Sequence, residues 1–218
     1  MKTATESLQK YGHKEFVISY DDRVVIQPDI DWLLTFLERQ VSEGVRYQPG
    51  ETVQIGWMFV KVGESEGKLE LTEPDLQRVP IVFVSGVTRT LSILRLQKSV
   101  AESLGLVDRM EFPTLPEGAI KCSRFEREDD FVMARSQPRH PNSGWFFGCC
   151  DPDHDHNAPQ NLWKTSLYQE VCERRLCAAF LALPVDSAIQ VSGKKVEAWF
   201  GNEELPILPG SFLAQLRL

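Results

Sequence analysis

Thr52-Val-Gln-Ile-Gly-Trp-Met-Phe-Val-Lys-Val62 is the stretch of sequence that decides the fold class. It is rich in β-branched and aromatic residues, which pack well on a pleated surface and favour strands. The turn-like segment Gly63–Gly67 joins it to a second run of this kind, Lys68–Leu71, and a third run follows at Val79–Val84. These runs predict three strands of one antiparallel sheet.

Helical patterns and a further strand pair surround these runs. On the N-terminal side, Glu15–Tyr20 and Arg23–Ile26 predict a hairpin, because the two aspartates between them suit a tight turn. From Pro28 to Gly44 the apolar residues recur at three- and four-residue intervals, which is typical of an amphipathic helix that stops at a glycine. The same spacing predicts a second helix over Thr88–Leu104, capped by Gly105.

The second half repeats this mixture after a break. Glu111–Gly118 holds two prolines and a glycine without helical or strand periodicity, so it is the expected linker between a domain over 1–110 and a domain over 119–218. The second domain is expected to contain strands at 119–123, 130–135 and 144–147, a helix at 166–183 and a hairpin of 189–191 with 196–200. The predicted fold class is α+β, with two small α+β units built of antiparallel sheets and packed helices.

Charge and composition exclude several classes of protein. The 218 residues contain 24 Lys and Arg against 31 Asp and Glu, a net charge of -7, which disfavours a protein that grips nucleic acid through phosphates. No apolar run is long enough to span a bilayer, and residues 1–14 lack the apolar core of a secretory signal. Five cysteines without a CxxC pair indicate reduced thiols. We therefore expect a cytoplasmic protein with no membrane or nucleic-acid partner.

The densest polar cluster is Cys149–Asn157, with two thiols, three carboxylates and two imidazoles in nine residues. Its candidate metal ligands are Cys149, His154 and His156. A second ligand pair is missing at regular spacing, because Cys122 and His140 are isolated in the sequence. We therefore expect a solvated turn without metal or any other cofactor, and keep a metal-binding module or metal-dependent enzyme as the alternative function.

Other catalytic patterns are weak. Ser143 lacks the glycine two residues before it that a nucleophile elbow requires, and no phosphate-binding loop occurs. No catalytic residues are therefore predicted. An acidic run is expected on a solvated face, where it is of interest as a recognition edge; it comprises Glu126, Glu128, Asp129 and Asp130.

The five tryptophans are candidates for the core. Trp32, Trp57 and Trp199 fall inside predicted helix or strand and are expected to be buried. Trp145 and Trp163 flank the polar cluster, where a tryptophan either seals the core or anchors a partner. Core packing is the favoured role, above all for Trp145.

Four segments together resemble a known family: Asn142-Ser-Gly-Trp-Phe-Phe-Gly148, the Asp-rich loop Asp151–Asn157, Asn161–Tyr168 with the pattern Asn-Leu-Trp-x-x-Ser-Leu-Tyr, and Leu183-Pro-Val-Asp-Ser187. They are similar to a bacterial domain of unknown function that is catalogued among the immunity proteins of polymorphic toxin systems. The resemblance covers about residues 120–200, and Asp186 stands where that family tends to have glycine. It implies an α+β fold and neutralisation of a toxin by binding, without enzymatic activity.

This resemblance implies a cognate toxin or effector as partner. Toxins that cleave nucleic acid tend to have basic clefts, which an acidic protein can reach quickly and block. The predicted partner-binding residues are Asp151, Asp153, Asp155 and Trp163, with the acidic run at 126–130 as the alternative edge.

Overall fold

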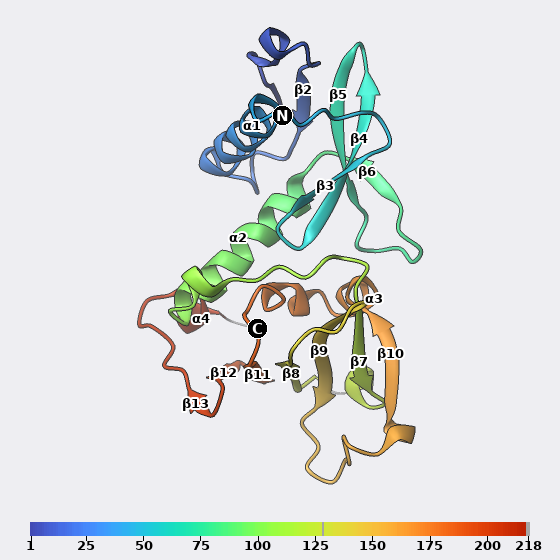
Figure 1. The fold of residues 1–218 in the computed structure, drawn as a ribbon. Coiled ribbons are helices and arrows are strands. Elements are labelled where there is room, and N and C mark those ends of the chain that lie inside the picture. Colours follow the sequence, from blue (N-terminus) through green and yellow to red (C-terminus); the bar gives the residue numbers. More distant parts are fainter. Residues whose placement is uncertain (128, 217–218) are drawn as a thin grey trace. The chain divides into compact units, whose positions relative to one another are not determined.

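The computed structural model describes residues 1–127 and 129–216 and divides the chain into two compact units, Met1–Arg95 (unit 1) and Leu96–Leu218 (unit 2) (Figure 1). Both units combine helices with a mixed sheet, which confirms the α+β class. The division falls inside helix α2 (Thr88–Ser103), whereas the sequence placed it at 111–118. That segment is a loop anchored within unit 2, since the Glu111 amide donates to the Ala182 carbonyl (3.0 Å) and Leu115 is buried.

Among the described residues, unit 1 has a six-stranded sheet in the order β1-β2-β5-β4-β3, with β6 paired to β5. Its strands are β1 (Lys2–Ala4), β2 (Phe16–Ser19), β3 (Thr52–Ile55), β4 (Met58–Ser65), β5 (Lys68–Pro74) and β6 (Phe83–Ser85). The strand expected over residues 52–62 is a hairpin, because the chain turns at Gly56 (φ 62°) and Trp57. The three runs predicted to form an antiparallel sheet do pair antiparallel, through β3–β4, β4–β5 and β5–β6. The sheet as a whole is mixed, because β2 and β5 run parallel.

The predicted hairpin of residues 15–20 and 23–26 was also wrong in its second half. The Asp21 carboxylate accepts the Arg23 amide (3.0 Å), and the Asp21 carbonyl accepts the amides of Val24 and Val25 (3.1 and 2.9 Å). These bonds coil the chain directly into α1 (Gln27–Ser42). Strand β2 instead pairs with β1 and β5.

Helix α1 supports the core of unit 1 as its periodicity predicts. Its buried residues pack with the sheet and with the first turn of α2; this face comprises Ile30, Leu33, Leu37 and Val41. Trp57 is buried at 1% exposure, as expected. Trp32 is 45% exposed on α1, where it stacks on Phe36, so its predicted burial was wrong.

Unit 2 has, within its described residues, a seven-stranded sheet in the order β10-β7-β9-β8-β11-β12-β13. The strands are β7 (Gly118–Cys122), β8 (Phe131–Arg135), β9 (Asn142–Cys149), β10 (Leu162–Ser166), β11 (Ser187–Ser192), β12 (Lys195–Phe200) and β13 (Glu203–Glu204). The helices of this unit include the part of α2 from Leu96 onward, α3 (Leu167–Glu173) and α4 (Phe212–Gln215). Strands β7 and β9 run parallel, so this sheet too is mixed where an antiparallel one was predicted.

The helix predicted over 166–183 is shorter than expected. It begins as predicted, with the Ser166 hydroxyl accepting the Gln169 amide (3.2 Å), but α3 ends at Glu173 and a 3-10 helix follows at Arg175–Ala179. Arg174 leaves helical geometry and donates to the Phe125 and Asp129 carbonyls (2.9 and 3.0 Å). These contacts from a distant segment override the local helical pattern.

No helix in the described part of the chain is both long and apolar enough to cross a bilayer.

Candidate functional site

Two cysteines meet at one end of the sheet of unit 2. Parallel neighbours β7 and β9 both end at a cysteine, Cys122 and Cys149. Because the carboxyl ends of parallel strands reach the same edge of a sheet, the two thiols come together although 27 residues separate them. The Cys149 amide lies 3.3 Å from the Cys122 sulfur, to which it donates. Both side chains are buried at 1% exposure.

The loop that follows β9 brings two histidines, His154 and His156, to the same place. His156 Nε2 lies 3.4 Å from the Cys149 sulfur, and the His154 and His156 rings are 5.0 Å apart between centroids. His154 is 8% exposed, and its Nε2 atom is buried without a hydrogen-bond partner in the described structure. The loop is therefore only partly the solvated turn that its composition indicates.

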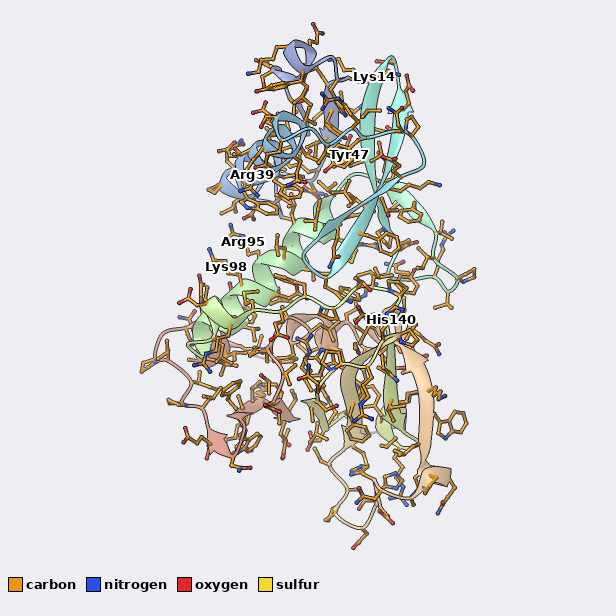
Figure 2. All side chains as sticks on the ribbon, viewed as in Figure 1. Lys14, Arg39, Tyr47, Arg95, Lys98 and His140 are labelled. Carbon is orange, nitrogen blue, oxygen red and sulfur yellow. The ribbon has the colours of Figure 1, made fainter. Side chains whose placement is uncertain are left out.

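Four residues each offer one ligand atom, and these atoms lie within 4.8 Å of one another. We call them the cysteine–histidine cluster: Cys122, Cys149, His154 and His156. Treating Cys122 as isolated was wrong. The signal that was missed is the parallel pairing of β7 with β9, which a single sequence does not display. The other isolated candidate, His140, precedes β9 and lies at the opposite end of that strand from the cluster (Figure 2).

The aspartates of the loop hold its backbone in place. The Asp151 carboxylate accepts the Asp153 amide (2.9 Å) and forms an ion pair with Arg124. The Asp155 carboxylate accepts the Asn157 amide (2.8 Å). These two turns give Asp151 and Asp155 a structural role in shaping the loop.

Beside the cluster lies an open depression of about 540 Å³. Its lining includes Cys122 and His154 of the cluster together with Asp153, Asp155 and Trp163. Trp163 belongs to β10, the strand at the edge of the sheet, and is 60% exposed. The core role favoured for Trp163 was therefore wrong, whereas Trp145 is buried at 1% exposure as expected.

Lys121 borders the same depression and is held by three carboxylates. Its buried ammonium pairs with Glu126, with the fully buried Glu170 (3.1 Å) and with Glu173 (3.2 Å). Burial lowers the pKa of Lys121, but the bonds to Glu126 and Glu170 outweigh it and hold that pKa above its ordinary value. Burial raises the pKa of Glu170. The network fixes β7 against α3.

The described residues of the alternative acidic edge, Glu126, Asp129 and Asp130, form separate contacts with other segments of unit 2. Glu126 is bound to Lys121, and the Asp130 carboxylate accepts the Gly193 amide (2.8 Å). The Asp129 carbonyl accepts the Arg174 guanidinium. Glu128 lies outside the described residues.

The cluster has the chemistry of a metal site more than that of a nucleophilic one. Two thiols and two imidazoles are the donors that zinc and related ions prefer. A cysteine nucleophile needs access to its substrate, whereas Cys149 and Cys122 are each 1% exposed.

Comparison of the chain with protein-family models, with curated proteins and with solved structures gave no match.

Proposed function

We propose that this protein is a non-enzymatic cytoplasmic binding protein of immunity type, which neutralises a cognate bacterial toxin through the Trp163 face of unit 2. We define the Trp163 face as Asp153, Asp155 and Trp163. The observation that carries the proposal is the 60% exposure of Trp163 beside two aspartates that line the same depression.

A largely exposed tryptophan is an effective anchor for a partner. Tryptophan is enriched among the residues that dominate binding free energy, because its large ring gains most when a partner removes it from water. Trp163 lies on β10, which is the terminal strand of its sheet, so a partner can approach it along the open edge as well as from the face. The Trp163 face thus combines an apolar anchor with a polar rim, as recognition surfaces commonly do.

The charge of the face suits a basic partner. Asp153 and Asp155 are exposed, whereas Asp151 is paired with Arg124 and contributes less to the field. With a net charge of -7 over the chain, the exposed carboxylates would attract a basic cleft and raise the association rate.

Two positions in the motifs that carry the resemblance have backbone conformations that favour glycine. Gly144 of the Ser-Gly-Trp motif has φ 82°, and a Cβ there would lie 2.0 Å from the Ser136 carbonyl oxygen, so only glycine fits. Asp186 has φ 69°, in the left-handed region that glycine adopts without penalty. A glycine at position 186, which the resemblance implies, would fit this conformation without strain.

The test is binding of the full chain to the toxin domain encoded beside its gene, measured by surface plasmon resonance together with protection from that toxin. We expect Trp163→Ala to weaken affinity by at least about 30-fold, the effect of losing a hot-spot tryptophan worth about 2 kcal/mol. The double change Asp153→Lys with Asp155→Lys should slow association and lessen its dependence on salt.

Matched controls separate this face from the rest of the chain. Trp32→Ala removes another exposed tryptophan, and Glu203→Lys with Glu204→Lys reverses two exposed charges on β13; both should bind normally apart from a small loss of long-range attraction. Equal binding by the Trp163→Ala and Trp32→Ala proteins would exclude the Trp163 face. Absence of any binding or protection would reject the proposed function itself.

A further inference from the structure

We propose that the cysteine–histidine cluster binds one Zn²⁺ ion, which fastens the loop after β9 to the ends of β7 and β9. The inference concerns the architecture of unit 2 and stands whether or not the Trp163 face binds a toxin.

The first support is convergence of donors from separate segments. One sulfur comes from the end of β7, the second from the end of β9, and both rings come from the following loop. Two of the four donors are placed by strand pairing and two by the turns around Asp151 and Asp155. Independent parts of the fold thus present two sulfur and two nitrogen ligands to one point, as a metal site requires.

The second support is an unsatisfied polar atom. His154 is 92% buried, yet its Nε2 has no hydrogen-bond partner among the described residues. Burying a polar nitrogen without a partner costs about 1–3 kcal/mol, so such atoms are rare in folded proteins. Coordination of a cation would satisfy this nitrogen.

The third support is the identity and spacing of the donors. A set of two thiolates and two imidazoles is typical of tetrahedral Zn²⁺, whose bonds of about 2.3 Å to sulfur and 2.0 Å to nitrogen place donors roughly 3.3–3.8 Å apart. Cys149 Sγ and His156 Nε2 are already 3.4 Å apart, and the remaining donors lie within 4.8 Å. Small side-chain rotations would complete the tetrahedron. The Cys149 amide that donates to the Cys122 sulfur would stabilise a metal-bound thiolate there.

The number of donors indicates a structural ion. Four protein ligands fill a tetrahedral site, whereas catalytic zinc keeps one position open for water or substrate. Because the loop is held at its start by Cys149 and at its middle by the two histidines, the ion would fix the segment that presents Asp153 and Asp155. It would act there as a cross-link.

The experiment measures metal in the full chain, produced with supplied zinc, reduced, and purified without a polyhistidine tag. Mass spectrometry of the metal content should find one zinc per chain that survives gel filtration in a weak chelator. The protein freed of zinc should then take up one Co²⁺, with the visible absorption of tetrahedral cobalt and a near-ultraviolet band from sulfur-to-cobalt charge transfer.

Variants assign the ligands, with matched controls of the same residue type. Cys122→Ser and His154→Ala should each lose most of the bound zinc and weaken the charge-transfer band or shift the visible bands. Cys150→Ser changes the thiol next to a ligand, and His140→Gln changes a histidine at the other end of β9; both should keep one zinc per chain (Figure 2).

Three results would overturn the proposal. The first is that the reduced wild-type chain retains no zinc or cobalt. The second is that the Cys122→Ser chain binds metal as well as wild type does. The third is that the control variants lose as much bound zinc as the ligand variants. A mass 2 Da lower than that of the reduced chain, assigned to a bond between Cys122 and Cys149, would instead identify the cluster as a disulfide. If a variant fails to fold, the cobalt spectrum of the wild-type chain still shows whether sulfur ligands bind a tetrahedral metal ion.

Discussion

Single residues in unit 2 show how a backbone conformation selects an amino acid. At Gly144 a side chain would collide with a carbonyl oxygen of the neighbouring segment, so the position admits glycine alone. Asp186 also has positive φ, but there the chain carries a side chain. Two backbone bonds hold that residue in place, from its amide to the Arg135 carbonyl (2.9 Å) and from the Gly201 amide to its own carbonyl (2.8 Å). The fold imposes this conformation on Asp186 against its intrinsic preference.

Asp186→Gly should therefore stabilise the protein. Relief of the left-handed conformation should raise the free energy of unfolding by about 0.5–1 kcal/mol, after the greater freedom of glycine in the unfolded chain is subtracted. Urea unfolding followed by circular dichroism measures this difference. Asp186→Ala is the control and should be less stable than wild type, because alanine tolerates positive φ less well than aspartate. Equal stability of the Gly and Ala variants would refute the explanation.

At the scale of elements, the end of β5 holds the start of α2. The buried Glu73 carboxylate accepts the amides of Arg89 and Thr90 (3.0 and 2.7 Å), which are donors that a helix leaves unsatisfied at its first turn. Burial raises the pKa of Glu73 despite these bonds. Nearby, Asp75 forms an ion pair with Arg89 (2.6 Å), and the hydrogen bond from that guanidinium lowers the Asp75 pKa. Both carboxylates thus bind the first turn of α2, but the pKa of Glu73 is raised whereas the pKa of Asp75 is lowered.

Asp75→Asn should reveal this ion pair through its pH dependence. Because the folded-state pKa of Asp75 lies below its ordinary value of 3.8, its contribution to stability is present above pH 3.8 and is lost as the pH falls through the folded-state pKa. The variant should be less stable than wild type at pH 6, and the two should converge in strong acid. Urea unfolding between pH 2.5 and 6 measures the difference.

A double-mutant cycle provides the control for Asp75. At pH 6, Arg89→Gln should destabilise the wild-type chain more than it destabilises the Asp75→Asn chain, since the partner has already been removed there. A difference between wild type and Asp75→Asn that grows toward acid pH would contradict the assigned sign.

The whole molecule comprises two units with different means of stabilisation. Unit 1 has a core formed by α1 against its sheet, whereas unit 2 adds the Lys121 network to its buried residues and contains the cysteine–histidine cluster proposed to bind zinc. Each unit has a sheet of its own, and none of the described strands belongs to both. We therefore expect local perturbations to remain within the unit in which they are made.

Hydrogen exchange measured by mass spectrometry tests this expectation on the full chain. If zinc fastens the loop, its removal should accelerate amide exchange in β7 and β9 while β4 and β5 exchange as before. Asp75→Asn should produce the reverse pattern, with faster exchange around β5 and the start of α2. Equal acceleration in both units after either change would show that the chain opens as one cooperative body.

The sequence by itself determined the features that depend on neighbours along the chain. The apolar spacing from Pro28 to Gly44 predicted α1, and the spacing from Thr88 onward predicted α2. Residues three and four apart in the sequence lie on the same face of a helix, so its buried face can be recognised from the sequence. The α+β class and the burial of Trp57 and Trp145 followed from patterns of the same kind.

Only the tertiary structure decided which distant segments meet. It paired β2 with β5 and β7 with β9 in parallel, and ended α3 where Arg174 reaches Phe125. The second of these pairings placed Cys122 beside Cys149 and created the candidate metal site. The reason is physical: periodicity reports which face of an element is apolar, whereas the choice of partner depends on packing between residues that are remote in sequence.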